Sequence, residues 1–297
     1  MLAPPFSPPP AALGLGTATF GREIDRPAAF QLLDHAVARG ITHFDTAALY
    51  GAGAAEQILG EWLARHRDRR AGSHVATKIY PPYTPAAITA ACTSSLQRLG
   101  LGFLDLLYLH KWDDRAKDPA ALAALHELVR HGAVRAIGAS NFDATQLATI
   151  HATQRQHGLT PFTFLQNNHN LAVREAEPGL RSYCATHAIQ VVTYSPLGAG
   201  FLTGKHRDGV PPGTRFAYSP GHGDIYFNDV CRRRLARLEA VAHRTGIAMP
   251  HLAIAWVFHQ AGINRVIVGG RGPEHIEQAL AARAFDDPSL FSELGHD

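Results

Sequence analysis

The sequence contains few cysteines and no long hydrophobic run. Its three cysteines, Cys92, Cys184 and Cys231, are odd in number, widely spaced and outside any CxxC motif, so they indicate neither a disulfide framework nor a zinc site. No apolar stretch approaches the ~18 residues that a membrane helix needs. The proline-rich start lacks the basic residues and apolar core of a signal peptide. We therefore expect a reduced, cytoplasmic protein that does not enter a membrane.

Several motifs of other protein classes are missing as well. The glycine pairs Gly14-x-Gly16, Gly51-x-Gly53 and Gly198-x-Gly200 each lack the third glycine of G-x-G-x-x-G, and no Walker lysine motif is present. His126, Glu127 and His131 miss the H-E-x-x-H spacing by one residue, so no metal site is predicted. A net charge of +3, with basic clusters on predicted helices, indicates solvated helix faces and no nucleic-acid partner.

Strand and helix patterns alternate along the chain. Strands are predicted at 13–17, 41–45, 74–78, 103–110, 134–140, 162–166, 189–194 and 266–269. Helices are predicted at 27–39, 54–66, 85–99, 119–131, 144–157, 176–187, 229–245, 250–260 and 273–283. Parallel strands need helical crossovers, and eight such units within about 300 residues favour a closed barrel over an open doubly wound sheet. We predict an α/β fold, a single-domain (β/α)8 TIM barrel over 13–285, between a flexible N-terminal tail at 1–12 and a C-terminal tail at 286–297.

The second to seventh predicted strands all end in a polar residue, and the ends of barrel strands are where active sites lie. These residues are Asp45, Lys78, His110, Ser140 with Asn141, Gln166 and Tyr194. Taken alone, Asp45 could cap the next helix and Tyr50 could be a loop aromatic. Across one mouth, however, Asp45 would hold Lys78 charged, and Lys78 would lower the pKa of Tyr50 from ~10, which makes Tyr50 a general acid. His110 would orient the oxygen that is protonated.

Motifs around these residues carry a resemblance over nearly the whole chain. They are Phe44-Asp45-Thr46-Ala47 with Tyr50-Gly51, Thr77-Lys78, Leu109-His110, Gly138 to Phe142, and Tyr194-Ser195-Pro196-Leu197-Gly198. In order and spacing the chain resembles the aldo-keto reductase superfamily, in the branch of potassium-channel β-subunit-like and aryl-alcohol dehydrogenase-like members. The resemblance implies an oxidoreductase of the EC 1.1.1 type that reduces an aldehyde or ketone, with Asp45, Tyr50, Lys78 and His110 as the catalytic residues. NADP(H) is the implied cofactor, and NAD(H) is the alternative.

The same resemblance implies where the cofactor binds. Ser140, Asn141 and Gln166 would bind the nicotinamide carboxamide, and Tyr194 would stack on its ring, with core packing as the alternative for Tyr194. The long segment 195–228 would clamp the cofactor, with Lys205 and Arg215 on its phosphates or, alternatively, as exposed cations on a mobile loop. The expected contacts are Gly16, Thr17, Asp45, Ser140, Asn141, Gln166, Tyr194, Ser195, Pro196, Leu197, Gly198, Gly200, Lys205, Arg215, Gly269, Gly270, Arg271, His275 and Gln278.

The eighth unit departs from the family pattern where the adenosine end is held. Arg271, His275, Gln278 and Ala279 replace the usual hydroxyl residue, Gln, Glu and Asn, and the loss of Asn at Ala279 argues for weaker adenine contacts. Arg271 precedes a helix N-terminus, where its guanidinium could take a 2′-phosphate, which favours NADP(H).

The substrate and the direction of reaction stay open. Phe20, Tyr80 and Trp112, with the acid Asp113, are expected to line a pocket for a small-molecule carbonyl compound. One alternative is an aldose or alcohol dehydrogenase that works in the oxidative direction with NAD(P)+. Another is a non-catalytic NADP(H)-binding regulatory subunit, although the complete set of catalytic residues disfavours it. The oligomeric state is not predicted.

Overall fold

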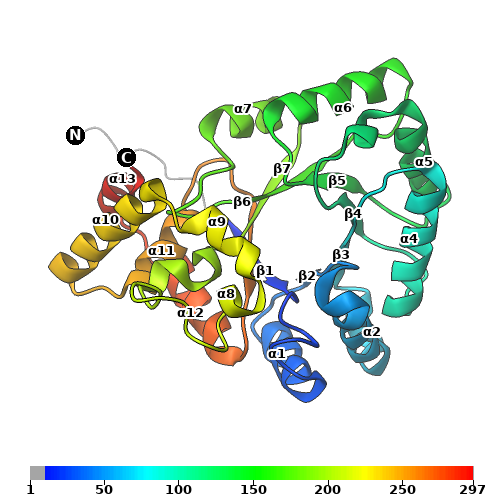
Figure 1. The fold of residues 1–297 in the computed structure, drawn as a ribbon. Coiled ribbons are helices and arrows are strands. Elements are labelled where there is room, and N and C mark those ends of the chain that lie inside the picture. The colour runs from blue at the N-terminus through cyan, green and yellow to red at the C-terminus, as the bar shows by residue number, and fades with distance from the viewer. Residues whose placement is uncertain (1–10, 297) are drawn as a thin grey trace, which may run out of the picture.

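The computed structural model describes residues 11–296 and confirms the predicted barrel (Figure 1). Eight parallel strands pair in sequence order, and β8 closes the barrel by pairing with β1. The strands are β1 (Ala12–Gly16), β2 (His43–Asp45), β3 (His74–Ile79), β4 (Leu106–Leu109), β5 (Ile137–Ser140), β6 (Phe164–Asn168), β7 (Gln190–Tyr194) and β8 (Arg265–Gly269). Of the predicted N-terminal tail, residues 1–10 lie outside the described residues. The early starts predicted for β4 and β5 correspond to an isolated bridge between Leu104 and Val134.

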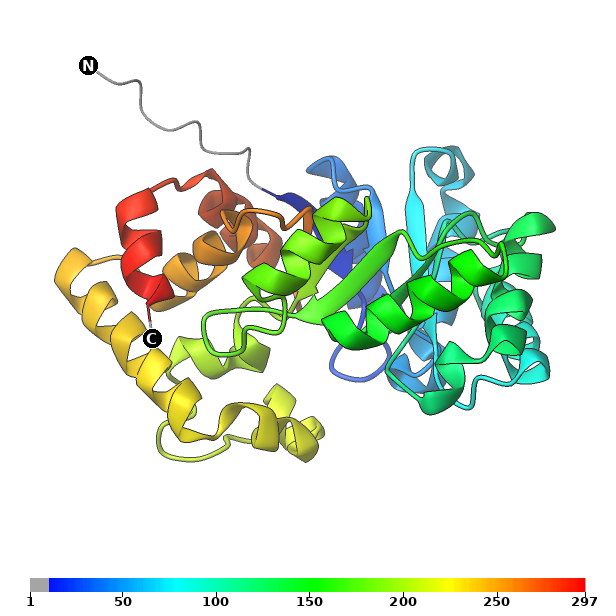
Figure 2. The same ribbon diagram turned by 90° about the horizontal axis from the view of Figure 1, so that it is seen from above.

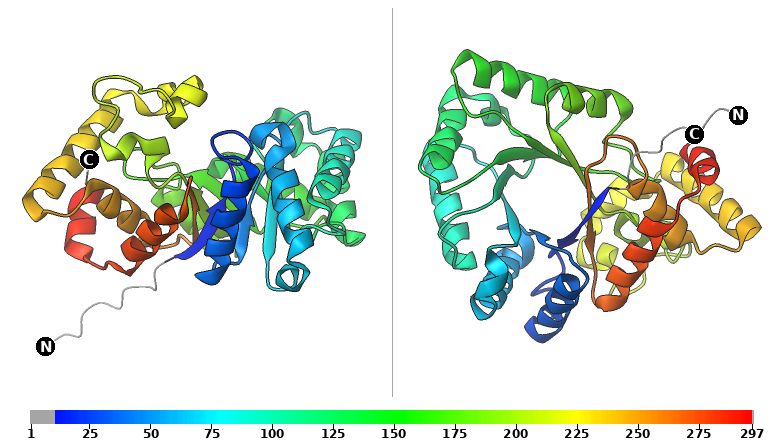
Figure 3. Two further views of the ribbon diagram at one scale, coloured as in Figure 1. Left: turned by 90° about the horizontal axis from the view of Figure 1, so that it is seen from below. Right: turned by 180° about the vertical axis from the view of Figure 1, so that it is seen from behind.

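Helices surround the strands, as the views in Figures 1 and 3 show. They are α1 (Arg26–Ala38), α2 (Ala54–Arg65), α3 (Arg67–Arg70), α4 (Pro85–Leu99), α5 (Pro119–Arg130), α6 (Ala144–Gln156), α7 (Pro178–Thr186), α8 (Arg215–Tyr218), α9 (Gly223–Tyr226), α10 (Asp229–Thr245), α11 (Met249–Phe258), α12 (Pro273–Ala284) and α13 (Pro288–Gly295). Short 3-10 turns are η1 (Tyr50–Gly53), η2 (Asp114–Lys117), η3 (Gly198–Thr203) and η4 (Pro220–His222). None of the helices between residues 11 and 296 is both long and apolar enough to cross a membrane.

Local sequence signals explain where the long helices begin and end. The side chains of Asp25, Thr84 and Asn228 accept backbone N–H groups at the starts of α1, α4 and α10, which satisfies donors that the helix itself leaves unpaired. Gly100 ends α4 and Gly246 ends α10, both in the left-handed conformation with φ of 63° and 72°. Glycine adopts this conformation without steric cost, so these boundaries follow from single residues.

The segment predicted as a C-terminal tail, 286–297, contains a packed helix. Leu290, Phe291 and Leu294 of α13 are buried, and Trp256 Nε1 of α11 donates to the Phe291 carbonyl at 3.1 Å. Figure 2 shows α13 (red) beside α10 and α11. The prediction missed this helix because only a short amphipathic stretch marks it, and its partners lie on helices earlier in the chain.

The strand register sorts the inward-facing residues into an apolar floor and a polar mouth. Strand residues alternate between the two faces of the sheet. Tyr108 of β4 is the register partner of Lys78 on the neighbouring strand β3. Ala76, Leu106 and Tyr108 form a small apolar cluster inside the barrel. Asp45 and Lys78 lie nearer the carboxyl ends of their strands, so their ion pair lies at the mouth of the barrel. Arg265, the first residue of β8, lies toward the opposite end, with its Nη1 3.2 Å from His43 Nδ1.

The contact of α2 with the end of α4 allows no additional methyl group. A Cβ on Gly60 would lie 2.5 Å from the Leu99 carbonyl oxygen. Gly60→Ala should therefore lower the free energy of unfolding in urea by roughly 1–3 kcal/mol, as overpacking does. Gly179→Ala on α7 is the matched control, since no atom lies within 4 Å of its added Cβ, and it should be neutral or stabilise by up to ~1 kcal/mol. Equal losses in both variants would contradict this account.

Candidate active site

A buried ion pair and a phenol lie together at the mouth of the barrel. Lys78 Nζ donates to Asp45 Oδ2 at 2.6 Å, to the Thr46 carbonyl at 2.9 Å and to Tyr50 Oη at 3.3 Å. Asp45 ends β2, Lys78 lies near the end of β3 and Tyr50 begins η1. The Asp45 and Lys78 side chains are 3% and 1% exposed, so the lysine acts on the phenol from beneath the surface.

The protonation states of this group follow from burial and from the ion pair. Burial is the largest single effect on the pKa of Lys78 and lowers it, but the charges and hydrogen bonds of Asp45 and Tyr50 together outweigh burial and raise that pKa, so the amine stays charged. Burial raises the pKa of Tyr50 by more than the Lys78 charge lowers it. The predicted lowering of the Tyr50 pKa is therefore wrong in this state: the phenol keeps its proton at neutral pH and is a ready donor.

His110 follows β4 and faces the phenol. Its ring lies 5.9 Å from that of Tyr50 at an interplanar angle of 82°. Burial first, and then the charges of Lys78 and Lys111, lower the pKa of His110 to about 3. The imidazole is thus neutral at physiological pH, and within the described chain its Nδ1 has no hydrogen-bond partner. A neutral ring of this kind can orient an oxygen beside Tyr50 but cannot supply a proton as imidazolium.

The strand ends around this group are tied to one another. Gln166 Nε2 donates to the second carboxylate oxygen of Asp45 at 2.8 Å, and Tyr194 Oη donates to Asn141 Oδ1 at 2.7 Å. Asn141 Nδ2 in turn donates to the His110 carbonyl at 2.8 Å. The contact between Gln166 and Asp45 was not predicted, because the residues are far apart in sequence and only barrel closure brings them together.

A cavity of about 570 Å³ opens above these residues. Asp45, Tyr50 and His110 line it, whereas Lys78 lies below its surface. Among the predicted cofactor contacts, the residues that line it are Gly16, Asp45, Ser140, Asn141, Gln166, Tyr194, Ser195, Pro196, Leu197, Gly200, Lys205, Arg215, Gly269, Gly270, Arg271, His275 and Gln278. Two predicted contacts do not line it: Thr17 is buried and donates to the Asp45 carbonyl, and Gly198 is buried within η3.

The predicted substrate-pocket residues lie elsewhere. Phe20 is fully buried in the core, so its assignment to the pocket is wrong. Tyr80 is 44% exposed with its ring 5.9 Å from His110, and Trp112 packs edge-on against Phe142 at 5.3 Å. Neither ring is among the residues that line the cavity, whereas the exposed Leu49, directly before Tyr50, is. The position of Leu49 directly before the predicted catalytic residue Tyr50 was a signal that could have identified it.

The three predicted phosphate ligands differ in their surroundings. Arg215 Nη1 lies 3.0 Å from Glu23 Oε1, and the Glu23 side chain, 5% exposed, also pairs with Arg22 at 2.6 Å. Arg215 is thus compensated by an acid that the sequence did not point to. Lys205 and Arg271 form no ion pair with any residue of the described chain, and burial together with the Arg271 charge lowers the pKa of Lys205. These two cations are the ones poised for an anionic ligand.

The wall of the cavity also joins distant segments. Thr19 Oγ1 donates to the Gly270 carbonyl at 2.8 Å, and Arg271 Nη1 donates to the Gly213 carbonyl at 3.2 Å. Contacts of this kind connect the loop after β1, the segment before α12 and the long segment after β7. Among residues 11–296 no group of three or more His, Cys, Asp or Glu side chains is arranged to hold a metal ion. The site therefore offers acid, amide and cationic groups around one concave surface.

Comparisons with known proteins agree with this geometry. A family model described as the aldo/keto reductase family matches residues 12–289. The chain is similar to the aldo-keto reductase dtxS3 of Metarhizium robertsii, with 28% identity in an alignment of 293 residues that covers 88% of this chain and 78% of that protein. It is also similar to an aldo/keto reductase from Klebsiella pneumoniae solved in complex with NADP and acetate, with a TM-score of 0.72, 27% identity, and coverage of 95% and 89% of the two chains.

The ion pairs of Glu23 hold the long segment after β7 to the loop after β1. Glu23→Gln should leave Arg215 without its acid, so hydrogen exchange of the amides at 213–219 should accelerate about tenfold, the equivalent of roughly 1.4 kcal/mol of lost local stability. Glu127→Gln is the matched control, because it removes only exposed ion pairs, with Arg130 and with His131, and such pairs contribute little. Unchanged exchange at 213–219 in Glu23→Gln would show that other contacts hold the segment.

Proposed function

The chain belongs to the aldo/keto reductase family, and on that premise we propose that it reduces an aldehyde or ketone to the alcohol, with NADPH as reductant and Tyr50 as general acid. The observation that carries this proposal is the Asp45–Lys78–Tyr50 chain, with 2.6 Å between the ion pair and 3.3 Å between lysine and phenol. Residues 13–285 are the proposed catalytic unit.

The residues around the cavity fit NADP(H). Amide groups of Asn141 and Gln166 lie beside the reactive group, and Lys205 and Arg271, which form no ion pair within the described residues, line the same cavity. A nicotinamide carboxamide and a phosphate-bearing end need this division of amides and cations. The related enzyme of Klebsiella pneumoniae, solved with NADP, supports the assignment. When bound, the cofactor supplies the hydride that the carbonyl carbon receives.

The chain's own residues handle the oxygen and its proton. The carbonyl oxygen of the substrate lies between the Tyr50 hydroxyl and the neutral His110 ring, and both hydrogen-bond to it. Tyr50 passes its proton to that oxygen as negative charge develops there. The Lys78 ammonium then stabilises the phenolate that remains. Asp45 keeps the lysine charged and close, and Gln166 holds the other oxygen of Asp45 at 2.8 Å.

The pKa shifts of the two candidates support Tyr50 and not His110 as the proposed acid. With its pKa lowered to about 3, His110 carries no second proton at neutral pH. Burial raises the pKa of Tyr50 above 10.0, so the phenol is fully protonated there. The Lys78 charge stabilises the phenolate more than the neutral phenol. This stabilisation grows as the proton leaves Tyr50, so it lowers the energy of the transition state more than that of the ground state.

Removing the phenol hydroxyl tests the proposed acid. Tyr50→Phe keeps the ring but removes the proton donor, so single-turnover reduction of a generic aldehyde at saturating NADPH should slow by ~10²–10⁴. NADPH affinity should survive. Tyr80→Phe is the matched control, because Tyr80 also lies 5.9 Å from the His110 ring but makes no contact with Lys78, and it should retain nearly the wild-type rate. A Tyr50→Phe enzyme that keeps more than about a tenth of the rate would transfer the role to another group.

Cofactor preference tests the role of Arg271. If its guanidinium binds the 2′-phosphate, the protein prefers NADPH to NADH, and Arg271→Ala loses a charge-assisted contact worth ~1.5–3 kcal/mol. NADPH binding should then weaken by about tenfold or more, while NADH binding is spared. Fluorescence titration with the two cofactors measures both affinities in the same variant. Equal losses for NADPH and NADH would show that Arg271 does not bind the 2′-phosphate.

A further inference from the structure

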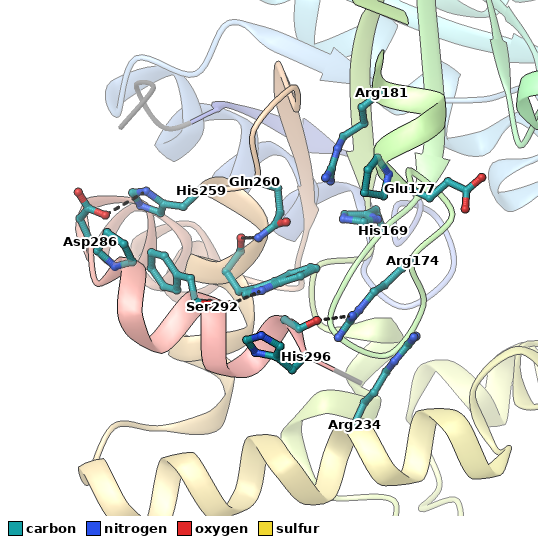
Figure 4. Close-up of a pocket in the computed structure, with 15 residues that line it drawn as sticks. His169, Arg174, Glu177, Arg181, Arg234, His259, Gln260, Asp286, Ser292 and His296 are labelled. Carbon is teal, nitrogen blue, oxygen red and sulfur yellow. Dashed lines mark hydrogen bonds and ion pairs between the residues drawn. The ribbon is translucent and has the colours of Figure 1, made fainter. Parts of the chain in front are cut away.

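A second cavity, of about 730 Å³, lies on the flank of the barrel among α7, α10, α11 and α13 (Figure 4). In the described chain it shares no lining residue with the cavity at the barrel mouth. Its wall combines the rings of Trp256 and Phe291 with the guanidinium groups of Arg174, Arg181 and Arg234. The proposed reductase chemistry uses none of these residues.

Two of the arginines are held in place by backbone carbonyls. Arg174 donates to the carbonyls of Gly295 and Leu294 at 2.6 and 3.3 Å, and its guanidinium lies 5.4 Å from the Trp256 ring centroid. Arg234 Nη1 donates to the Ala172 carbonyl at 2.8 Å. These contacts bring positive charge to one wall of the cavity and restrict its motion.

Arg181 lies on α7 and is half-buried. Burial lowers its pKa, and no hydrogen bond or ion pair joins its guanidinium to any residue between 11 and 296. The acid Glu177 also lines the cavity, but Figure 4 shows its carboxylate directed away from Arg181 and His169. A partly desolvated guanidinium without an acid is unfavourable, so this group is poised for an anion from outside the chain.

His169 follows β6 and faces the same cavity. It is 2% exposed, its ring stacks 5.4 Å from that of Trp256 at 24°, and neither ring nitrogen has a partner in the described chain. Burial first, and then the charge of Arg181, lower its pKa to about 3, so the neutral ring carries one N–H donor. Figure 4 shows the Arg181 guanidinium beside this ring.

We propose that the flank cavity binds a small organic oxyanion, a carboxylate or phosphate group carried on an aromatic body. Arg181 and His169 donate to the oxyanion, and the exposed side chains of Pro178 and Pro288, which also line the cavity, pack against the body. Charge-assisted hydrogen bonds from a guanidinium are the stronger class of such contacts. These two prolines favour an aromatic compound over an inorganic ion, because an aromatic ring packed against them adds a hydrophobic contribution.

The test is calorimetric titration of phenyl phosphate and of benzoate into the full chain saturated with NADP+, which occupies the residues that bind the cofactor. Binding beside Tyr50 is recognised because Arg181→Gln leaves it unchanged. Either probe should bind saturably at one site. Arg181→Gln should weaken binding by at least about tenfold, as for loss of one charge-assisted contact. His169→Phe, which keeps a ring against Trp256, should weaken it similarly. Arg233→Gln is the matched control: it removes the same charge from an exposed position on α10 and should bind as the wild type does.

Each outcome of the titrations either supports or overturns the proposed oxyanion site. Binding of phenyl phosphate alone assigns phosphate esters, and binding of benzoate alone assigns carboxylates. No saturable heat with either probe overturns the proposal. Binding that is equally strong in Arg181→Gln and Arg233→Gln also overturns it, because the anion then lies elsewhere. Aldehyde reduction is measured in each variant in parallel, and retained activity shows that the variant is folded, independently of whether the flank cavity binds the probes.

Discussion

The buried ion pair between Lys78 and Asp45 is the interaction on which the site depends. Two charges removed from water are costly unless geometry and further hydrogen bonds compensate them. Here the Lys78 ammonium also donates to the Thr46 carbonyl and the Asp45 carboxylate also accepts from Gln166. Both charged groups therefore have hydrogen-bond partners besides each other. The pair consequently presents a fixed positive charge to Tyr50 from below. Adjacent parallel strands hold the two residues, which makes that charge as rigid as the barrel itself.

Of the cations that line the cavity above the pair, Arg215 has an acid partner, whereas Lys205 and Arg271 have none within the described chain. Glu23 neutralises Arg215 and so ties the segment after β7 across the mouth. The flank cavity shows the same contrast, because the half-buried Arg181 has no acid partner among residues 11–296. A cation that lines a cavity without an acid partner attracts anions, so an anionic ligand is expected to bind there.

Much of the fold and of the reactive group was predictable. Helix starts and ends follow from caps such as Asp25 and Gly100, and a polar residue at successive strand ends identified Asp45, Lys78 and His110. The errors have physical causes. The direction of the Tyr50 pKa depends on how completely it is buried, and the burial of Thr17 and Phe20 depends on packing against distant segments. Neither quantity is encoded within a few neighbouring residues.

The sequence by itself determined the alternation of strands and helices, and with it the barrel, because hydrophobic period and turn residues are local properties. It also determined which side chains end the strands. The tertiary structure was needed to show which side chains touch, as Gln166 and Asp45 do, and which charges have no ion-pair partner within residues 11–296, as with Arg181. Those properties come from closing β8 onto β1 and packing α13 onto α11, contacts between residues far apart in the chain.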